Sequence, residues 1–439
     1  MILFRCFIFV FGIVIWSASV CAQEKERNTQ KGGSAAGTEN SKGRPPAGFY
    51  DDRIVKPEQI SKRPMIARVI VAPFGVIGRP MEKGLNYVEE SRALDRLVII
   101  LNHPNIRPVF GNLGDGSGFG GGAYLSTADS LSPFKIFGLG HITSKRYLHG
   151  LAGVSVRPSP ALGEKLELFT TAELRLRPEE DFWGMGPQSG TTRTNYDLQN
   201  RTVSAGLTYR PTTNWRAGTA LVYDSASVFG GRDKRFPTTQ SVFPVDTVPG
   251  LVEGAALLSP TAFVEYDRRG RGNAPIRGFY AMATIASNDS VGSGDYGFWS
   301  YTVDSRFYVP LLSDGRVLAA RTLLWFNDPK GGSQVPFFRM AQLGDSQTLR
   351  GYDSQRFRGN NAAAWNVEYR TDLTGFVGAF AFTDFGQVFD NRSEFNTDNF
   401  RVTYGGGLQF KSRESVFLRV YLAKSDESSR FFFTLGPTF

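Results

Sequence analysis

The sequence contains almost no cysteine. Only Cys6 and Cys21 are present in 439 residues. A chain without further cysteines has no disulfide framework in its main part and no thiolate ligands for a metal. Long hydrophobic runs are also missing after residue 22, since no later stretch approaches the roughly 18 uninterrupted apolar residues of a spanning helix. These absences exclude a disulfide-rich secreted domain and a helical membrane protein.

Histidine is scarce as well, with His103, His141 and His149 the only three. Three scattered imidazoles form no metal site and place no general base beside a nucleophile. Gly344-Asp-Ser resembles the start of a serine-hydrolase motif, and Gly116-Ser-Gly-Phe-Gly-Gly has the glycine spacing of a dinucleotide loop. No histidine accompanies the first on the predicted strands, and no strand–helix unit surrounds the second. We expect no enzyme activity, no cofactor and no bound metal.

The first residues have the pattern of a secretory signal peptide. Arg5 supplies positive charge, Phe7 to Trp16 is apolar, and Val20-Cys21-Ala22 resembles a cleavage site. We therefore predict a signal peptide over residues 1–22. A lipoprotein with lipid on Cys21 is the alternative, although Val20 is a poor residue before a lipidated cysteine.

Two segments of different character follow. Residues 23–63 start as a polar, apolar-poor stretch and are predicted to be a disordered periplasmic tail. Residues 64–105 include apolar residues at helical spacing, so we predict an amphipathic helical segment whose apolar face needs cover. The net charge of +9 is modest; it is compatible with an anionic membrane surface, but an ordinary, mildly basic surface is the favoured interpretation. Nucleic acid is an unexpected partner for an exported chain.

From about residue 106 to residue 439 the apolar period changes to two. One face of each segment is apolar and the other carries charge: Trp365, Val367 and Tyr369 alternate with Asn366, Glu368 and Arg370. In a soluble sandwich the charged face lies outside, whereas in a membrane barrel it lines the lumen and the apolar face meets lipid. Segments of about ten residues, with the predicted signal peptide, favour the membrane barrel.

The last predicted strand, 430–439, carries a terminal barrel signal. It places four apolar residues on one face and ends on an aromatic: Phe431, Phe433, Leu435 and Phe439. Alternation and turn signals together predict sixteen antiparallel strands, at 106–112, 119–129, 134–143, 147–157, 166–177, 201–210, 214–226, 259–268, 279–288, 299–309, 316–326, 363–371, 377–388, 400–411, 416–424 and 430–439. With an even number of strands, the chain enters and leaves the barrel on the same side of the membrane, the periplasmic side. The long connections 178–200, 227–258 and 327–362 then fall on the outer face of the membrane.

The loop before the twelfth predicted strand is polar, rich in glycine and rich in arginine. It contains Leu349-Arg350-Gly351-Tyr352 and Arg356-Phe357-Arg358-Gly359, and the next strand contains Phe382-Thr383-Asp384-Phe385-Gly386-Gln387-Val388-Phe389. With Tyr266-Asp267-Arg268-Arg269 after the eighth strand, these motifs make residues 106–439 resemble the bacterial surface antigen family. Its members are the BamA- and TamA-like outer-membrane assembly and translocation barrels.

The resemblance implies a role for the loop. The loop would fold into the lumen, where Arg350 pairs with a carboxylate of the wall, here Asp384, beside Gly386. Gly351 would permit close backbone approach, and Tyr352 would wedge against the wall. Such a lock either only rigidifies the barrel or also switches it. The resemblance further implies weak pairing of the first and last strands, and the glycine-rich stretch 111–122 fits that expectation.

The predicted function is insertion or translocation of polypeptides at the outer membrane of a Gram-negative bacterium, with the N-terminal segment in the periplasm. The alternatives are a passive solute channel and a membrane anchor for a periplasmic partner. Expected partners are outer-membrane lipids and nascent outer-membrane or secreted polypeptides, and a homodimer is left open. Residues 23–105 are too few for more than about one polypeptide-transport-associated (POTRA) domain and lack its strand pattern, so the chain resembles a short member without POTRA domains.

Overall fold

The computed structural model describes residues 105–127, 133–158, 165–270, 274–292, 294–311, 313–411 and 416–439. The predicted signal peptide, the predicted tail and nearly all of the predicted helical segment lie outside these residues, as does His103. In the part of the chain that is described, no helix has the length and apolar character needed to cross a membrane.

Sixteen strands form one antiparallel sheet, as the alternation predicts. The strands are β1 (Ile106–Gly111), β2 (Gly120–Ser126), β3 (Phe134–Thr143), β4 (Leu148–Val156), β5 (Leu166–Phe182), β6 (Thr194–Tyr209), β7 (Trp215–Gly230), β8 (Ala255–Asp267), β9 (Gly278–Ser290), β10 (Gly297–Leu311), β11 (Ser313–Pro329), β14 (Asn361–Asp372), β15 (Val377–Phe389), β16 (Arg401–Lys411), β17 (Val416–Lys424) and β18 (Ser429–Thr434). Each strand pairs with its neighbour in sequence, except that β11 pairs with β14. The short strands β12 (Ala341–Leu343) and β13 (Phe357–Gly359) pair with each other inside the connection.

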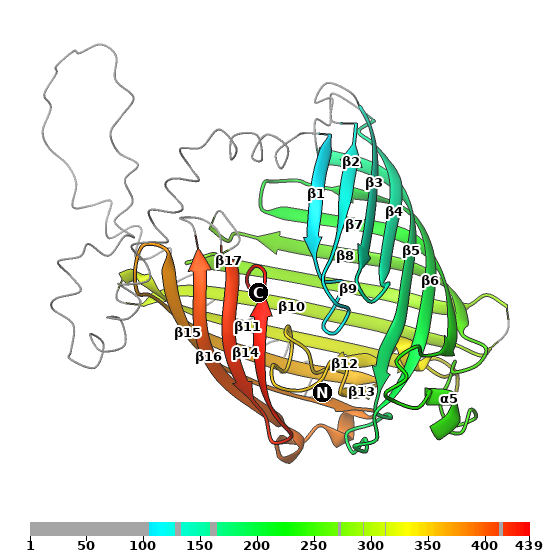
Figure 1. The fold of residues 1–439 in the computed structure, drawn as a ribbon. Helices are drawn as coiled ribbons and strands as arrows, with labels where there is room; N and C mark the ends of the chain where they lie inside the picture. Colours follow the sequence, from blue (N-terminus) through cyan, green and yellow to red (C-terminus); the bar gives the residue numbers. More distant parts are fainter. Residues whose placement is uncertain are drawn as a thin grey trace, which may run out of the picture. The chain divides into compact units, whose positions relative to one another are not determined.

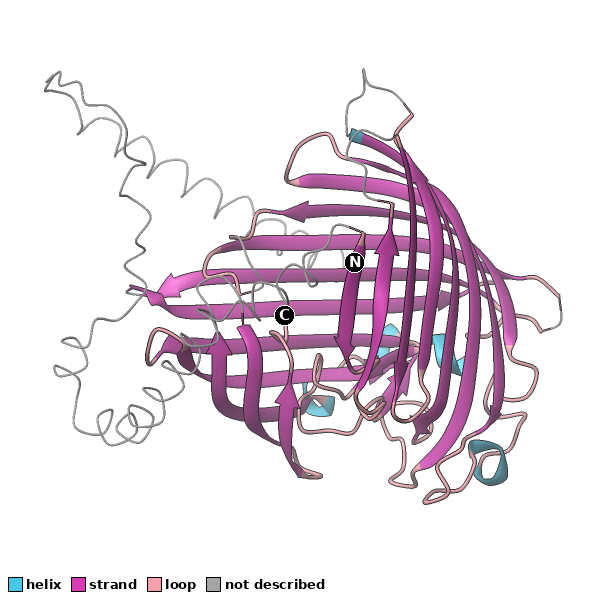
Figure 2. Ribbon diagram, turned by 45° about the horizontal axis from the view of Figure 1, so that its top comes forward, coloured by secondary structure: helices cyan, strands magenta, loops and turns pink. Residues whose placement is uncertain are grey.

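The sheet curls on itself, so that its first strands and its last strands approach the same side while β7 to β11 form the opposite wall (Figures 1 and 2). The strands β1 and β18 stand at the two ends of the hydrogen-bonded order. We call the boundary between these two strands the seam. The hairpins that flank it are the first hairpin, β1–β2, and the last hairpin, β17–β18.

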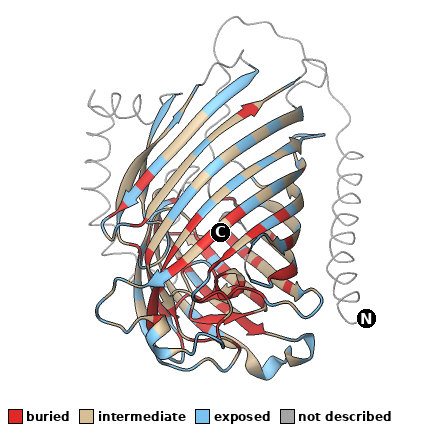
Figure 3. Cartoon of the chain, turned by 90° about the vertical axis from the view of Figure 1, so that its right-hand side faces the viewer, coloured by how far each residue is buried: buried red, intermediate tan, exposed pale blue. Residues whose placement is uncertain are grey.

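Burial alternates along the strands, as the bands of Figure 3 show. On β14, Glu368 is fully buried, whereas Tyr369 is 38% exposed. The outer face carries the exposed large apolar residues that a lipid-facing surface requires, among them Val203, Leu221, Leu422 and Phe431. The inner face carries the charged residues.

Several strands extend further toward the long connections than the alternation predicts. β5 continues to Phe182, and β6 begins at Thr194. The reason is that inward-facing residues become apolar at this end: Phe182 and Tyr196 are buried against loop residues such as Phe337. A strand that is covered on its inner face no longer alternates between apolar and charged residues.

The last strand is shorter than predicted, and one residue of the predicted terminal barrel signal lies elsewhere. β18 ends at Thr434, and Gly436 adopts a φ of +82°, so the chain turns before Pro437. Phe431, Phe433 and Leu435 remain exposed on the outer face, whereas Phe439 is only 4% exposed. Phe439 packs with three residues of the inner wall, Tyr308, Val317 and Ala319. The prediction that Phe439 shares the outer face was therefore wrong, because a glycine–proline turn ends the alternation.

Candidate functional site

The connection between β11 and β14 folds back against the inner wall of the barrel. Its strand β12 lies against β14 and β15, and β13 lies against β15. The chain reverses at Gly344 and Gly351, whose φ angles of +100° and +110° suit glycine alone. Leu349 is fully buried in an apolar cluster with residues of β12, β13, β14 and β15.

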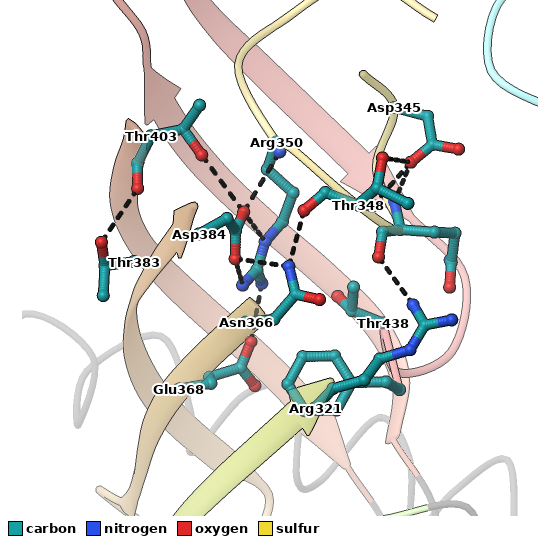
Figure 4. Close-up of polar contacts among 12 residues, drawn as sticks. Arg321, Asp345, Thr348, Arg350, Asn366, Glu368, Thr383, Asp384, Thr403 and Thr438 are labelled. Atoms are coloured by element: carbon teal, nitrogen blue, oxygen red, sulfur yellow. Dashed lines mark hydrogen bonds and ion pairs between the residues drawn. The ribbon is translucent and has the colours of Figure 1, made fainter. Parts of the chain in front are cut away.

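Arg350 is the centre of the site and has no exposed surface. Its Nε donates to Asp384 Oδ2 at 2.8 Å, its Nη2 donates to Asp384 Oδ1 at 2.6 Å, and its backbone N–H donates to Oδ2 at 3.1 Å. Its Nη1 donates to Glu368 Oε2 at 2.7 Å. The planar guanidinium thus forms a two-point contact with one carboxylate and a third with another (Figure 4). Arg350 and Asp384, the pair implied by the resemblance, are in contact.

Two side chains of the wall also hold Asp384 in place. Asn366 Nδ2 donates to Asp384 Oδ1 at 2.9 Å, and Thr403 Oγ1 donates to Oδ2 at 3.2 Å. The same Asn366 nitrogen donates to the loop carbonyl of Thr348 at 2.6 Å, which ties the loop backbone to β14 (Figure 4). The guanidinium carbon of Arg350 lies 3.5 Å from the centre of the Phe382 ring, a cation–π contact that shields the pair from water.

Glu368 accepts from three arginines, a feature that the sequence alone does not indicate. Besides Arg350, it accepts from Arg370 Nε at 2.6 Å and from Arg419 Nη2. Three guanidinium groups and the two carboxylates Glu368 and Asp384 give this buried cluster a net charge of +1.

Oxygens of Thr438 and Phe439 accept hydrogen bonds from two further donors of the cluster. Arg419 Nη1 donates to Thr438 Oγ1 at 2.6 Å, and Arg370 Nη2 donates to the Phe439 carbonyl at 3.2 Å. The inward turn at Gly436 therefore brings Thr438 and Phe439 to the same cluster that holds Arg350.

Two glycines of the motifs permit close backbone approach. A side chain on Gly351 of the loop would lie 3.2 Å from the backbone of Lys424 on β17, and one on Gly386 of β15 would lie 2.7 Å from the Ala363 carbonyl of the neighbouring strand β14. Tyr352 is buried, and its hydroxyl donates to Asp426 in the turn after β17. Burial and then the Asp426 carboxylate raise the pKa of Tyr352, so the hydroxyl keeps its proton.

Arg356 and Arg358 bind other partners than Arg350 does. Arg356 forms a two-point contact with Glu427, 2.8 Å from Nε and 2.7 Å from Nη2. Arg358 is buried and donates to the Phe337 carbonyl at 2.7 Å and to the Tyr196 hydroxyl at 3.1 Å. The three arginines therefore have three different environments, and only Arg350 binds two buried carboxylates.

Asp345 organises the turn before Arg350. Its Oδ1 accepts from the N–H groups of Gln347 and Thr348 and from the Thr348 hydroxyl, at 2.8, 2.6 and 2.8 Å. Burial and then the nearby Asp115 carboxylate raise the pKa of Asp345. The next residue, Ser346, donates through its hydroxyl to Asp115 Oδ1 at 2.8 Å. The partner of this serine is thus a carboxylate of the first hairpin.

An aromatic cluster lies at the end of the barrel that carries the long connections. It joins residues of β5, β6, β7, β8 and β10 with residues of three loops, and its largest members are Phe182, Tyr196, Phe298, Phe337 and Phe338. Phe337 contacts both Phe182 and Tyr196 edge-to-face, with ring centres 5.3 and 4.9 Å apart. Buried apolar side chains thus occupy part of this end of the barrel.

The other sequence features lie apart from Arg350. His141 and His149 face each other across β3 and β4, and His149 contacts Glu173 at 2.7 Å. The glycine-rich stretch 112–119 is the turn of the first hairpin and precedes a strand, not a helix. Among the described residues, no group of three or more potential ligands is placed to hold a metal ion.

Fold and site together define a class: a sixteen-stranded membrane β-barrel with an arginine-bearing loop held against its inner wall. Residues 157–439 match the model of the Omp85 superfamily domain. This match covers more than half of the chain, and the protein belongs to the Omp85 superfamily. Membership in this family supports a location in the outer membrane of a Gram-negative bacterium and agrees with the resemblance drawn from the loop motifs.

Solved structures agree with this fold. BamA from Haemophilus ducreyi lacking POTRA domains 1–3 is 17% identical with a TM-score of 0.57, over 76% of this chain and 69% of that one. CdiB from Escherichia coli is 13% identical with a TM-score of 0.48, over 75% and 61%. CdiB from Acinetobacter baumannii is 13% identical with a TM-score of 0.44, over 76% and 59%. At these identities the likeness to BamA shows a shared fold.

Proposed function

We propose that this barrel inserts or translocates polypeptides at the outer membrane, without covalent chemistry or a nucleotide, and that the Arg350 loop holds its resting state. The observation that carries the proposal is the burial of Arg350 between Asp384 and Glu368. A loop anchored this deeply has two defined states, docked and released, rather than a continuum of positions. Polypeptides that enter the outer membrane or cross it are the substrates, and membrane lipids contact the apolar outer face.

The energetics favour a switch. Removing one partner from a buried ion pair costs about 3–5 kcal/mol, because the other charge is left without compensation. Replacing a well-satisfied pair by apolar residues is often neutral or stabilising. A rigid barrel therefore has no need of five buried charges at one point of its wall. A loop that must dock and release does need polar partners, since released guanidinium and carboxylate groups are well solvated.

The aromatic cluster at the outer end argues against the passive channel. Open solute channels keep a polar, water-filled lumen. Here Phe182, Tyr196 and Phe337 are each no more than 1% exposed. Steady diffusion of polar solutes would require this cluster to separate. Nothing comparable favours the membrane anchor.

Deletion of the gene followed by quantitative outer-membrane proteomics tests the proposed function. Loss of a defined set of outer-membrane or secreted proteins, restored by the wild-type gene but not by Arg350→Ala, is expected. The matched control is Arg392→Gln, which removes an exposed ion pair with Asp328 on the outer surface. An unchanged proteome together with altered uptake of small solutes would overturn the proposal in favour of the channel.

A further inference from the structure

The docked loop contacts both sides of the seam. Successive antiparallel strands alternate in direction, so the turns of the first and last hairpins lie at the same end of the barrel as the β11–β14 connection. We define residues 345–356 of that connection as the strap. The first hairpin turn, residues 112–119, and the last hairpin turn, residues 425–428, both contact the strap.

On the first side the contact is a single side chain. Asp115 accepts from the hydroxyl of Ser346 at 2.8 Å and also from its backbone N–H. The turn is shaped to present this carboxylate, because Gly114 and Gly116 have φ angles of +132° and +83°. Ser117, fully buried, closes the turn with a hydrogen bond to the Gly114 carbonyl at 2.8 Å.

On the last side the strap has several contacts, and two of them are ion pairs. The Gly351 carbonyl accepts from the Ser428 hydroxyl at 2.8 Å and from the Ser425 hydroxyl at 3.1 Å. The two-point Arg356–Glu427 pair lies on this turn. The remaining contacts of the strap on this side are Tyr352 with Asp426 and Asp353 with Arg430 of β18 itself.

The two attachments differ in strength. On the last side, two ion pairs and three hydrogen bonds hold four residues of the strap to the last hairpin. On the first side, one carboxylate accepts two hydrogen bonds from one serine, and no ion pair accompanies them among the described residues. Asp115 also lies near the acidic side chain of Asp345, so that a second negative charge is disfavoured at this place. The first attachment is therefore the weaker link.

We propose that the strap clasps the seam by joining its two hairpins, and that it releases the first hairpin at Ser346–Asp115 while staying attached to the last. Asp115 is then a positioning residue that sets how readily the seam opens. Among the described strands β1 pairs only with β2, and release of the first hairpin would give a strand of the substrate polypeptide access to the backbone groups on the other edge of β1. The use of the open seam rests on the proposed function, whereas the clasp itself rests on the contacts alone.

Hydrogen exchange of the full chain in lipid nanodiscs tests the clasp without reference to activity. In Asp115→Ala, amides of residues 106–126 should exchange at least tenfold faster, and those of residues 416–434 should be unchanged. In Glu427→Ala, residues 416–434 should change by less than threefold, because the other contacts of the strap remain. Asp328→Asn, outside the strap, is the control and should alter neither hairpin. Unchanged exchange at 106–126 in Asp115→Ala, or an equal rise in both hairpins, would overturn the clasp.

Covalent closure tests the direction of release. Cysteine pairs are introduced at Asp115 and Ser346 on one side and at Tyr352 and Asp426 on the other, and both are joined by the same short reducible thiol crosslinker. The first-side link should abolish complementation of the deletion strain until it is reduced, and the last-side link should be tolerated. Tolerance of both links, or loss with both, would overturn release at Ser346. An intact proteome in the deletion strain would instead overturn the proposed function and leave the exchange result standing.

Discussion

Arg350 contacts Asp384 with both its side chain and its backbone. The carboxylate accepts Nε and the backbone N–H through one oxygen and Nη2 through the other. Asp384 therefore fixes the path of the loop as well as the place of the guanidinium. Loss of the Arg350–Asp384 contact should therefore displace the loop backbone as well as the arginine side chain.

The first prediction concerns this pair. Arg350→Ala should lower the free energy of unfolding by about 3–5 kcal/mol, because Asp384 and Glu368 lose a buried counter-charge. The shift in heat-modified gel mobility with temperature, measured in detergent, reports it. Combining Arg350→Ala with Asp384→Asn should cost clearly less than the sum of the single changes, since the two residues share one interaction. Strict additivity would show that the pair is not coupled.

A second prediction separates backbone strain from crowding at Gly351. An L-residue in the left-handed region costs about 1–2 kcal/mol. Gly351→Ala adds a contact of 3.2 Å with the backbone of Lys424, whereas a side chain on Gly332, at a φ of +88°, would meet nothing within 4 Å. Thermal unfolding should therefore show a larger loss for Gly351→Ala than for Gly332→Ala. Equal losses of stability for the two variants would indicate that the last hairpin does not crowd a side chain at position 351.

The third prediction follows from the inward turn at Gly436. Phe439→Ala should cost about 3–5 kcal/mol, the usual cost of emptying a buried phenylalanine site. Phe433→Ala makes the same chemical change on the exposed outer face and should cost about 0.5 kcal/mol in detergent. The comparison is made by thermal unfolding of the two purified variants. A small loss of stability for Phe439→Ala would indicate that Phe439 lies on the outer face after all.

The fourth prediction concerns pH. The pKa of Asp345 is raised in the folded loop, first by burial and then by Asp115. The folded state therefore binds a proton that the unfolded chain releases, and stability falls as pH rises through the folded pKa. Above the ordinary aspartate pKa of about 3.9, the wild type should lose stability relative to Asp345→Asn as the pH rises toward the folded pKa. Parallel pH profiles of the thermal midpoint would contradict this assignment.

Local patterning was sufficient for the barrel. The predicted strand 363–371 is observed as β14, Asn361–Asp372, because alternation of apolar and charged residues is a property of neighbours in sequence. The alternating pattern did not predict strand ends that are determined by packing against distant segments. The buried aromatic residues of β5 and β6 face loops, and the end of β18 is set by a turn.

The site was predictable only in part. Arg350 and Asp384 belong to motifs that the sequence displays. Glu368 was visible as an inward-facing charge with Arg370 on the same strand, but Arg350 and Arg419 reach it from other segments. Asp115 and Ser346 are 231 residues apart, and no local pattern links them. The glycine–proline step at Gly436 was the one available sign that Phe439 leaves the outer face.

Ion conductance of the purified full chain in planar bilayers tests the central claim, a lumen closed by a docked loop, most directly. The wild-type barrel should show low, fluctuating conductance, and Arg350→Ala should show frequent large openings, while Arg392→Gln behaves as wild type. Steady, large conductance of the wild-type barrel, unchanged by Arg350→Ala, would contradict the account and identify a passive channel.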